Sequence, residues 1–171
     1  MLFPHEGIVG PIGRKDFSAE MTVNEEQLFD IIQNVWFTVV SLRLEPLLPG
    51  QSRNDIESEF LCAWMETEGD WNGGLLITCQ ESLAKEAAAV MYEVSDSMLG
   101  EDAIHDTIGE LANMIAGSTK VLLPEDVSLL QPQVLEEADL PELCLSSWPL
   151  LNIATQYEGQ LLYVSLFKWN S

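Results

Sequence analysis

The sequence predicts an α/β fold in which one mixed, largely antiparallel sheet carries two long helices on one face. Two stretches place apolar residues at intervals of three and four, the pattern of an amphipathic helix. Two others are pairs of apolar runs joined by short Gly-containing turns, the pattern of a β-hairpin. Because these features alternate along the chain, residues 24–80 and 102–169 form a weak helix–hairpin repeat, which predicts a pseudo-twofold architecture.

The first half opens with a helix over about 24–42, for which Asn24 is the expected N-cap. Strands over 59–68 and 74–80 follow, and a Gly-Asp-Trp-Asn-Gly turn joins them. The 59–68 strand is apolar on both faces. This pattern predicts a strand that is covered on two sides or lies at an interface.

A shorter helix over about 83–93 separates the halves, and the second long helix covers about 102–119. Residues 121–135 read as a loop broken by prolines, with one short strand. A final hairpin pairs 148–157 with 160–169 around a Glu-Gly turn. The last strand is again apolar on both faces.

Composition excludes several classes of function. The chain has 171 residues, a net charge of −21 and only seven Lys and Arg, so neither nucleic-acid binding nor adsorption to an anionic membrane is expected. No apolar run approaches the roughly 18 residues that cross a bilayer, and the start lacks a signal-peptide pattern. Three cysteines without a CxxC pair indicate reduced thiols in a cytoplasmic protein. Residues 1–22, rich in Gly and Pro, are predicted to be an irregular arm preceding a single domain over 23–171.

The second long helix carries an unusual polar stripe. At about 100° per residue, four positions share one narrow band of its surface: Asp106, Glu110, Asn113 and Gly117. Asn is a poor mid-helix residue, and Gly109 and Gly117 each cost roughly 1 kcal/mol relative to Ala. A face kept only for solubility would not need these residues, so the stripe indicates a functional site.

The residues alone leave other interpretations open. A Glu and an Asn three apart on a helix are most often a solvated face. His105 lies beside Asp102 and Asp106, but it turns about 100° away from Asp106, so a metal site is not expected. Ser118 and Thr119 have no His nearby in sequence, and nucleophilic catalysis is therefore unsupported.

Residues 103–120 contain the string Asp-x3-Glu-x2-Asn at Asp106, Glu110 and Asn113, followed later by a proline. In this the sequence resembles the chemotaxis phosphatase family typified by CheC and CheX, whose flagellar-switch relatives include FliY and FliM. The stretch Gly-Glu-Leu-Ala-Asn-Met-Ile-Ala-Gly is the most specific part of the resemblance, which extends over about 24–170. The family's proline lies somewhat more than twenty residues beyond the Asn, whereas Pro132 is 19 beyond Asn113 (132 − 113).

The chain looks more like CheX than CheC, which usually carries two copies of the motif. In the first long helix, Asp30 and Asn34 stand where the second has Glu110 and Asn113, and no Glu lies three residues before Asn34. One half of the repeat is therefore predicted to retain the polar pair and the other to have lost it.

The resemblance implies hydrolysis of an aspartyl phosphate on a CheY-like receiver domain. Asn113 would orient the attacking water, and Glu110 would pair with the receiver's lysine. Asp106 would widen the acidic contact, while Gly109 and Gly117 would let the partner's loop approach closely. Magnesium would come with the receiver, and the chain would need no cofactor of its own.

Two further expectations follow from the resemblance. The alternative to a phosphatase is a non-catalytic interaction module that binds a receiver or a flagellar-switch component. A homodimer is also expected, since CheX-like proteins often pair and the strands that are apolar on both faces could lie at an interface.

Overall fold

The computed structural model describes residues 23–48, 59–124, 126–136, 139–142 and 147–169; the predicted arm over 1–22 lies outside them. The helices of the described chain are α1 (Glu25–Val40), α2 (Glu81–Tyr92), the short 3-10 helix η2 (Asp96–Met98) and α3 (Glu101–Lys120). Its strands are β1 (Glu45–Pro46), β2 (Phe60–Gly69), β3 (Gly73–Gln80), β4 (Val127–Leu129), β5 (Gln133–Glu136), β6 (Leu151–Tyr157) and β7 (Gln160–Lys168).

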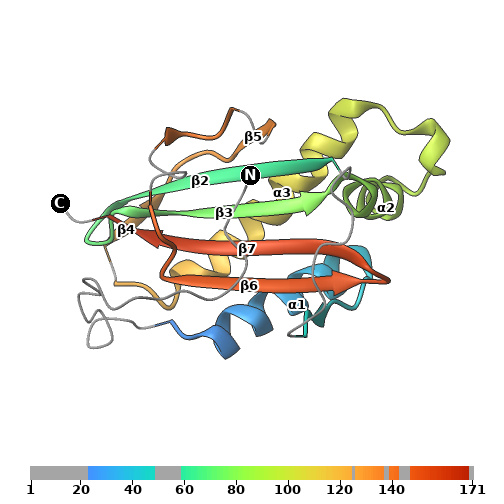
Figure 1. The fold of residues 1–171 in the computed structure, drawn as a ribbon. Coiled ribbons are helices and arrows are strands. Elements are labelled where there is room, and N and C mark those ends of the chain that lie inside the picture. Colours follow the sequence, from blue (N-terminus) through green and yellow to red (C-terminus); the bar gives the residue numbers. More distant parts are fainter. Residues whose placement is uncertain (1–22, 49–58, 125, 137–138, 143–146, 170–171) are drawn as a thin grey trace.

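The strands form one sheet in the order β1-β6-β7-β3-β2-β4, and β5 pairs with β2 as well. Every pairing between described strands is antiparallel. The helices lie on one face of this sheet, behind it in the view of Figure 1. The predicted α/β architecture is therefore confirmed.

Sheet topology shows how the two halves of the repeat fit together. Strand β3 ends the first hairpin and β7 ends the second, and the two pair at the centre of the sheet. The short strand β1 of the first half pairs with β6 of the second. Conversely, β4 and β5 of the second half pair with β2 of the first. Each half thus completes the other's edge, as a pseudo-twofold axis between β3 and β7 requires (Figure 1).

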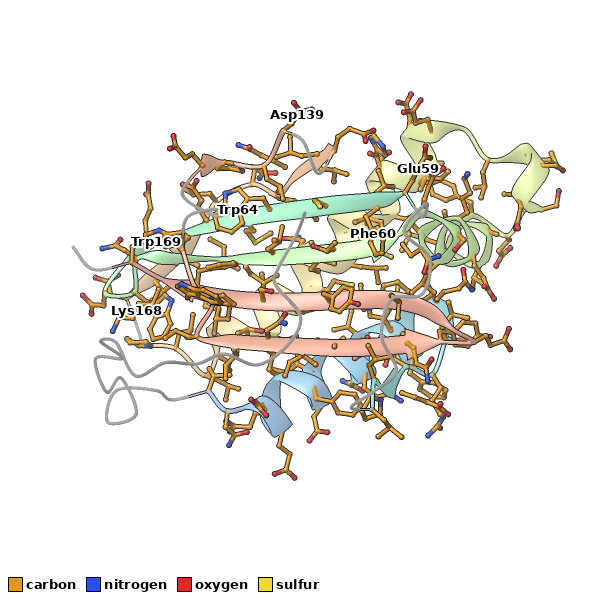
Figure 2. All side chains as sticks on the ribbon, in the orientation of Figure 1. Glu59, Phe60, Trp64, Asp139, Lys168 and Trp169 are labelled. Carbon is orange, nitrogen blue, oxygen red and sulfur yellow. The ribbon has the colours of Figure 1, made fainter. Side chains whose placement is uncertain are left out.

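Alternation of side chains explains why two strands are apolar on both faces. On the helix side, Leu61 and Ala63 of β2 join the main core with residues of all three α-helices. On the opposite side, Trp64 packs with Phe167 and Trp169, at ring-centroid distances of 5.9 and 5.8 Å. Figure 2 shows Trp64 and Trp169 together on that face. Both β2 and β7 lie inside the sheet, so their apolar faces reflect two-sided burial, and neither is available for pairing at a sheet edge.

The three α-helices and the four long strands begin and end within three residues of their predicted bounds. Asn24 caps α1 in a capping box: its Oδ1 accepts from the Gln27 backbone N–H at 2.9 Å, while Gln27 Oε1 accepts from the Asn24 N–H at 3.1 Å. The helix ends at Val40, shorter than expected, because Ser41 adopts a left-handed conformation with φ 58°. After α3 the chain forms two short strands rather than the one predicted.

Replacing Gly74 with Ala is expected to destabilise the sheet. A Cβ at this position would lie 2.3 Å from Trp64 Cη2, and the Trp64 ring is itself held against Phe167 and Trp169. Overpacking of this kind costs about 1–3 kcal/mol. Urea unfolding followed by circular dichroism measures the loss, with Gly117→Ala, where an added Cβ meets nothing within 4 Å, as the control. Equal unfolding free energies for Gly74→Ala and the wild type would contradict this packing.

Candidate active site on helix α3

Helix α3 presents two contrasting faces. Its buried face is formed by nine residues: Ile104, Thr107, Ile108, Gly109, Leu111, Ala112, Ile115, Ala116 and Thr119. Most of them belong to the main core, and α3 packs across β2 and beside α1 and α2. Acidic residues in its first turn and Lys120 in its last suit the helix dipole. The helix is therefore a rigid element that holds its opposite face in a fixed position.

The predicted stripe lies on that opposite face. Asp106, Glu110, Asn113 and Gly117 are all exposed. Glu110 and Asn113 are one turn apart, about 4.5 Å along the helix axis. In the part of the chain that the structure describes, no hydrogen bond or ion pair holds the side chains of Asp106, Glu110 or Asn113. All three are thus available to a partner.

This stripe is not arranged for the stability of the helix. Asp106 and Glu110 are like charges at positions i and i+4, which destabilises a helix by about 0.2–0.5 kcal/mol. Gly117 has no neighbour within 4 Å of where a Cβ would stand, so nothing in the described protein requires a glycine there. Glycine costs the helix about 1 kcal/mol relative to Ala, and no contact among the described residues compensates for this loss.

Gly109, predicted with Gly117 to let the partner's loop approach closely, lies on the buried face of α3 and not beside the exposed stripe. It is buried, and a Cβ there would lie 3.4 Å from Val134 Cγ2 on β5. Pro132 precedes β5 directly, and β5 packs against α3. A Cβ at Gly109 would therefore make an ordinary van der Waals contact with β5, and this strand covers the glycine from a partner. A helical wheel could not show this, because the covering strand comes from later in the chain.

The first long helix aligns with α3 in a different register from the one predicted. Adding 76 to the numbers of the five buried residues of α1 gives five buried residues of α3: Leu28, Ile32, Val35, Trp36 and Val40 become Ile104, Ile108, Leu111, Ala112 and Ala116. In this register Asn34 corresponds to Glu110, not to Asn113 (34 + 76 = 110).

The position equivalent to Asn113 on α1 is therefore Phe37 (37 + 76 = 113). Its ring is 48% exposed, with the Arg43 guanidinium carbon 5.1 Å from the ring centroid. A phenylalanine offers neither a hydrogen-bond donor nor an acceptor. The equivalent face of α1 consequently lacks the polar chemistry found on α3.

Two other side chains that could act as nucleophiles, Thr119 and Cys79, are buried. Thr119 is buried and its hydroxyl donates to the Ile115 carbonyl at 2.8 Å. Burial raises the pKa of the Cys79 thiol well above its usual range, so this side chain remains a protonated thiol. Within the described ranges, no three His, Cys, Asp or Glu side chains are grouped so that they could hold a metal ion.

His105 lines a separate acidic cleft beside the N-terminal end of α3. Lys85 pairs with Glu81 there, and this hydrogen-bonded ion pair holds the pKa of the Glu81 carboxyl below its usual value. A hydrogen bond to Glu81 raises the pKa of Glu59. Glu59 and Glu81 thus interact with Lys85 and with one another, and none of the four stripe residues lines this cleft.

Comparison with known protein families identifies one that matches this chain. The sequence model of the family described as "Chemotaxis phosphatase CheX" matches residues 61–153, more than half of the chain and including all of α3. No curated protein sequence matches the chain. None of the described helices is long and apolar enough to span a bilayer.

Solved structures show the same fold. Chemotaxis protein CheX from Vibrio vulnificus superposes with a TM-score of 0.66 at 20% identity, over 85% of this chain and 95% of that one. A CheC-like superfamily protein from Shewanella sp. PV-4 gives 0.67 at 20% identity, over 86% and 100%. The third is the CheX–CheY–BeF3–Mg2+ complex from Borrelia burgdorferi, with a TM-score of 0.62 at 16% identity, over 85% and 97%.

Proposed function

The chain belongs to the CheX family of chemotaxis phosphatases, and on that basis we propose that it hydrolyses the aspartyl phosphate of a CheY-like receiver domain. The observation that carries this proposal is the exposed pair Glu110 and Asn113, one turn apart on a helix whose other face is fixed in the core. Residues 61–153, which match the family, include both.

Asn113 is proposed to orient the attacking water. An acyl phosphate is already activated, so catalysis requires mainly that a water be held in line with the phosphorus. A carboxamide suits this task because it donates through its NH2 group and accepts through its oxygen. The exposed position of Asn113, with no competing hydrogen bond in the described chain, leaves both functions available.

Glu110 is proposed to fix the docking register by pairing with the receiver's lysine, a charge-assisted contact. Asp106, one turn earlier and also exposed, widens this acidic contact. The net charge of −21 steers the chain towards basic surfaces of a partner. These residues act on binding and alignment, whereas Asn113 acts on the water.

Magnesium is proposed to belong to the receiver and not to this chain. The Borrelia burgdorferi complex contains CheX, CheY, BeF3 and Mg2+ together. In this chain, the described side chains provide no cluster of three candidate ligands. The divalent ion would neutralise the phosphoryl oxygens on the receiver, and this chain would orient the attacking water.

Gly117→Ala separates stability from activity. The added methyl group meets no atom within 4 Å, so the helix should gain about 0.5–1 kcal/mol of unfolding free energy. The same methyl group stands one turn beyond Asn113, where the receiver must approach. We expect KM for the phosphorylated receiver to rise roughly tenfold, the effect of losing about 1.4 kcal/mol of docking free energy. A more stable variant with unchanged KM would argue against contact at this glycine.

A panel of receivers from the same genome tests the proposed function. Each receiver is phosphorylated, and the decay of its aspartyl phosphate is followed with and without this protein. Acceleration of one receiver supports the phosphatase and identifies its partner. No acceleration of any receiver by the folded protein would contradict it.

A non-catalytic interaction module is the alternative function. It is favoured by one observation: α1 keeps the same buried face as α3 without the Glu–Asn pair, so the scaffold does not depend on that pair. Binding to a phosphorylated receiver without any change in the lifetime of its phosphate would establish this alternative.

The homodimer stays a prediction. The strands that suggested it, β2 and β7, lie inside the sheet and are buried on both faces within one chain. Pairing would therefore have to use another surface.

A further inference from the structure

The exposed face of α3 changes character along the helix. Towards the N-terminus it carries the carboxylates Asp106 and Glu110. Towards the C-terminus, beyond Asn113, it carries apolar side chains: Met114 is 36% exposed, and Val121, the C-cap residue, is 82% exposed. Single apolar residues are common on protein surfaces, so exposure by itself identifies no site. Their position relative to the proposed site is the informative feature.

Helical geometry places both apolar side chains beside the proposed site. At 100° per residue, Met114 and Val121 lie within about 40° of the direction of Glu110. Val121 continues the helical path, since its φ is −60° and its ψ is −24°. Met114 precedes Gly117 by about 4.5 Å along the axis, and Val121 follows it by about 6 Å. The glycine therefore forms a notch between two apolar side chains.

Nothing in the described part of the chain accounts for this notch. A Cβ at Gly117 would meet no atom within 4 Å, and Val121 is more exposed than any other large hydrophobic residue described. A glycine in open space and an uncovered valine each have a cost in a free monomer. Both costs are offset if another molecule packs on this end of the helix.

We propose that Met114 and Val121 form an apolar flank of the docking surface for the receiver domain, and that they help to select the cognate receiver. The inference rests on the proposed function, because the receiver is identified as the partner only by the position of this flank next to Asn113 and Glu110. The flank packs on apolar side chains next to the receiver's phosphorylation site, while the notch at Gly117 admits its backbone. Neither side chain touches the reacting atoms.

This division of the surface has a physical consequence. Contacts of Asp106 and Glu110 with basic groups weaken as salt screens them. Burial of Met114 and Val121 does not depend on screening, and it excludes water from around the ionic contact. Affinity at high ionic strength should therefore depend mainly on the apolar flank.

The double variant Met114→Ala/Val121→Ala tests the flank. Its matched control is Val90→Ala/Met98→Ala, which removes the same residue types from α2 and η2, where they are 41% and 73% exposed. Three quantities are measured with the receiver identified by the panel: the Kd for its beryllium-fluoride-loaded form by calorimetry, and kcat and KM for its phosphorylated form. Calorimetry is repeated at high salt.

We expect Kd and KM to rise at least about tenfold in the flank variant, with kcat and the thermal midpoint unchanged and the control variant like the wild type. At high salt the difference in Kd should persist. Unchanged Kd and KM in the flank variant, equal losses in the control, or a fall in kcat alone would overturn the inference while leaving the phosphatase intact. A wild-type protein that neither binds nor dephosphorylates any receiver would remove the proposed function and this inference together.

Discussion

Asn113→Ala is expected to slow dephosphorylation of the receiver by about a hundredfold, the usual cost of misplacing a reacting group. The side chain is exposed and makes no hydrogen bond within the described chain, so its removal leaves the fold intact. Because Ala is the better helix former, the variant should be about 0.5 kcal/mol more stable than the wild type. A loss of kcat in a more stable protein separates catalysis from folding.

Two companion variants sharpen this result. Asn113→Asp keeps the shape but loses both amide donors and adds a negative charge facing the phosphoryl group, so it should be equally inactive. Asn34→Ala removes the same exposed residue type from α1, at the position that corresponds to Glu110, and should retain full activity. Wild-type kcat in Asn113→Ala would eliminate the water-orienting role.

Glu110→Lys is expected to raise KM for the phosphorylated receiver by at least about tenfold, because it replaces an attractive charge contact with a repulsive one. The substitution also removes the i,i+4 repulsion between Asp106 and Glu110, so the free energy of unfolding should not fall. Steady-state kinetics at several salt concentrations measure the effect, which should diminish as salt screens it.

Asp30→Lys is the matched control for this charge reversal. Asp30 is an exposed mid-helix carboxylate on α1, and its reversal changes the net charge by the same amount. If both variants raise KM equally, the effect comes from the overall field of the acidic protein and not from a contact at Glu110.

Periodicity within a segment predicted which face of α3 is exposed. The apolar spacing of α3 placed Asp106, Glu110, Asn113 and Gly117 on an exposed face, and all four are exposed. The alternation of hairpins and helices predicted the repeat, and the pairings of β1 with β6 and of β4 and β5 with β2 complete it. The spacing of apolar residues that predicted the helices and hairpins is a local pattern, and local physics determines it.

Contacts between distant segments were beyond sequence reasoning. Gly109 is buried because Val134 of β5 approaches it from 25 residues away (134 − 109), which no helical wheel includes. The predicted alignment of α1 with α3 was based on the spacing of polar residues, and it matched Asn34 with Asn113. In the structure the buried residues of the two helices determine the alignment, and Phe37 is then the residue equivalent to Asn113. A strand that is apolar on both faces can lie inside a sheet or at an interface between molecules. Only the order of strands in the sheet shows that β2 and β7 lie inside it.

Decay of aspartyl phosphate on the cognate receiver, in the presence of wild-type protein or Glu110→Ala/Asn113→Ala, tests the central claim most directly. Beryllium-fluoride-loaded receiver reports binding in the same samples, and circular dichroism verifies the fold. We expect the wild type to accelerate decay and the folded double variant to leave the spontaneous rate unchanged. Equal acceleration by both proteins would contradict the assignment of the site to this face of α3.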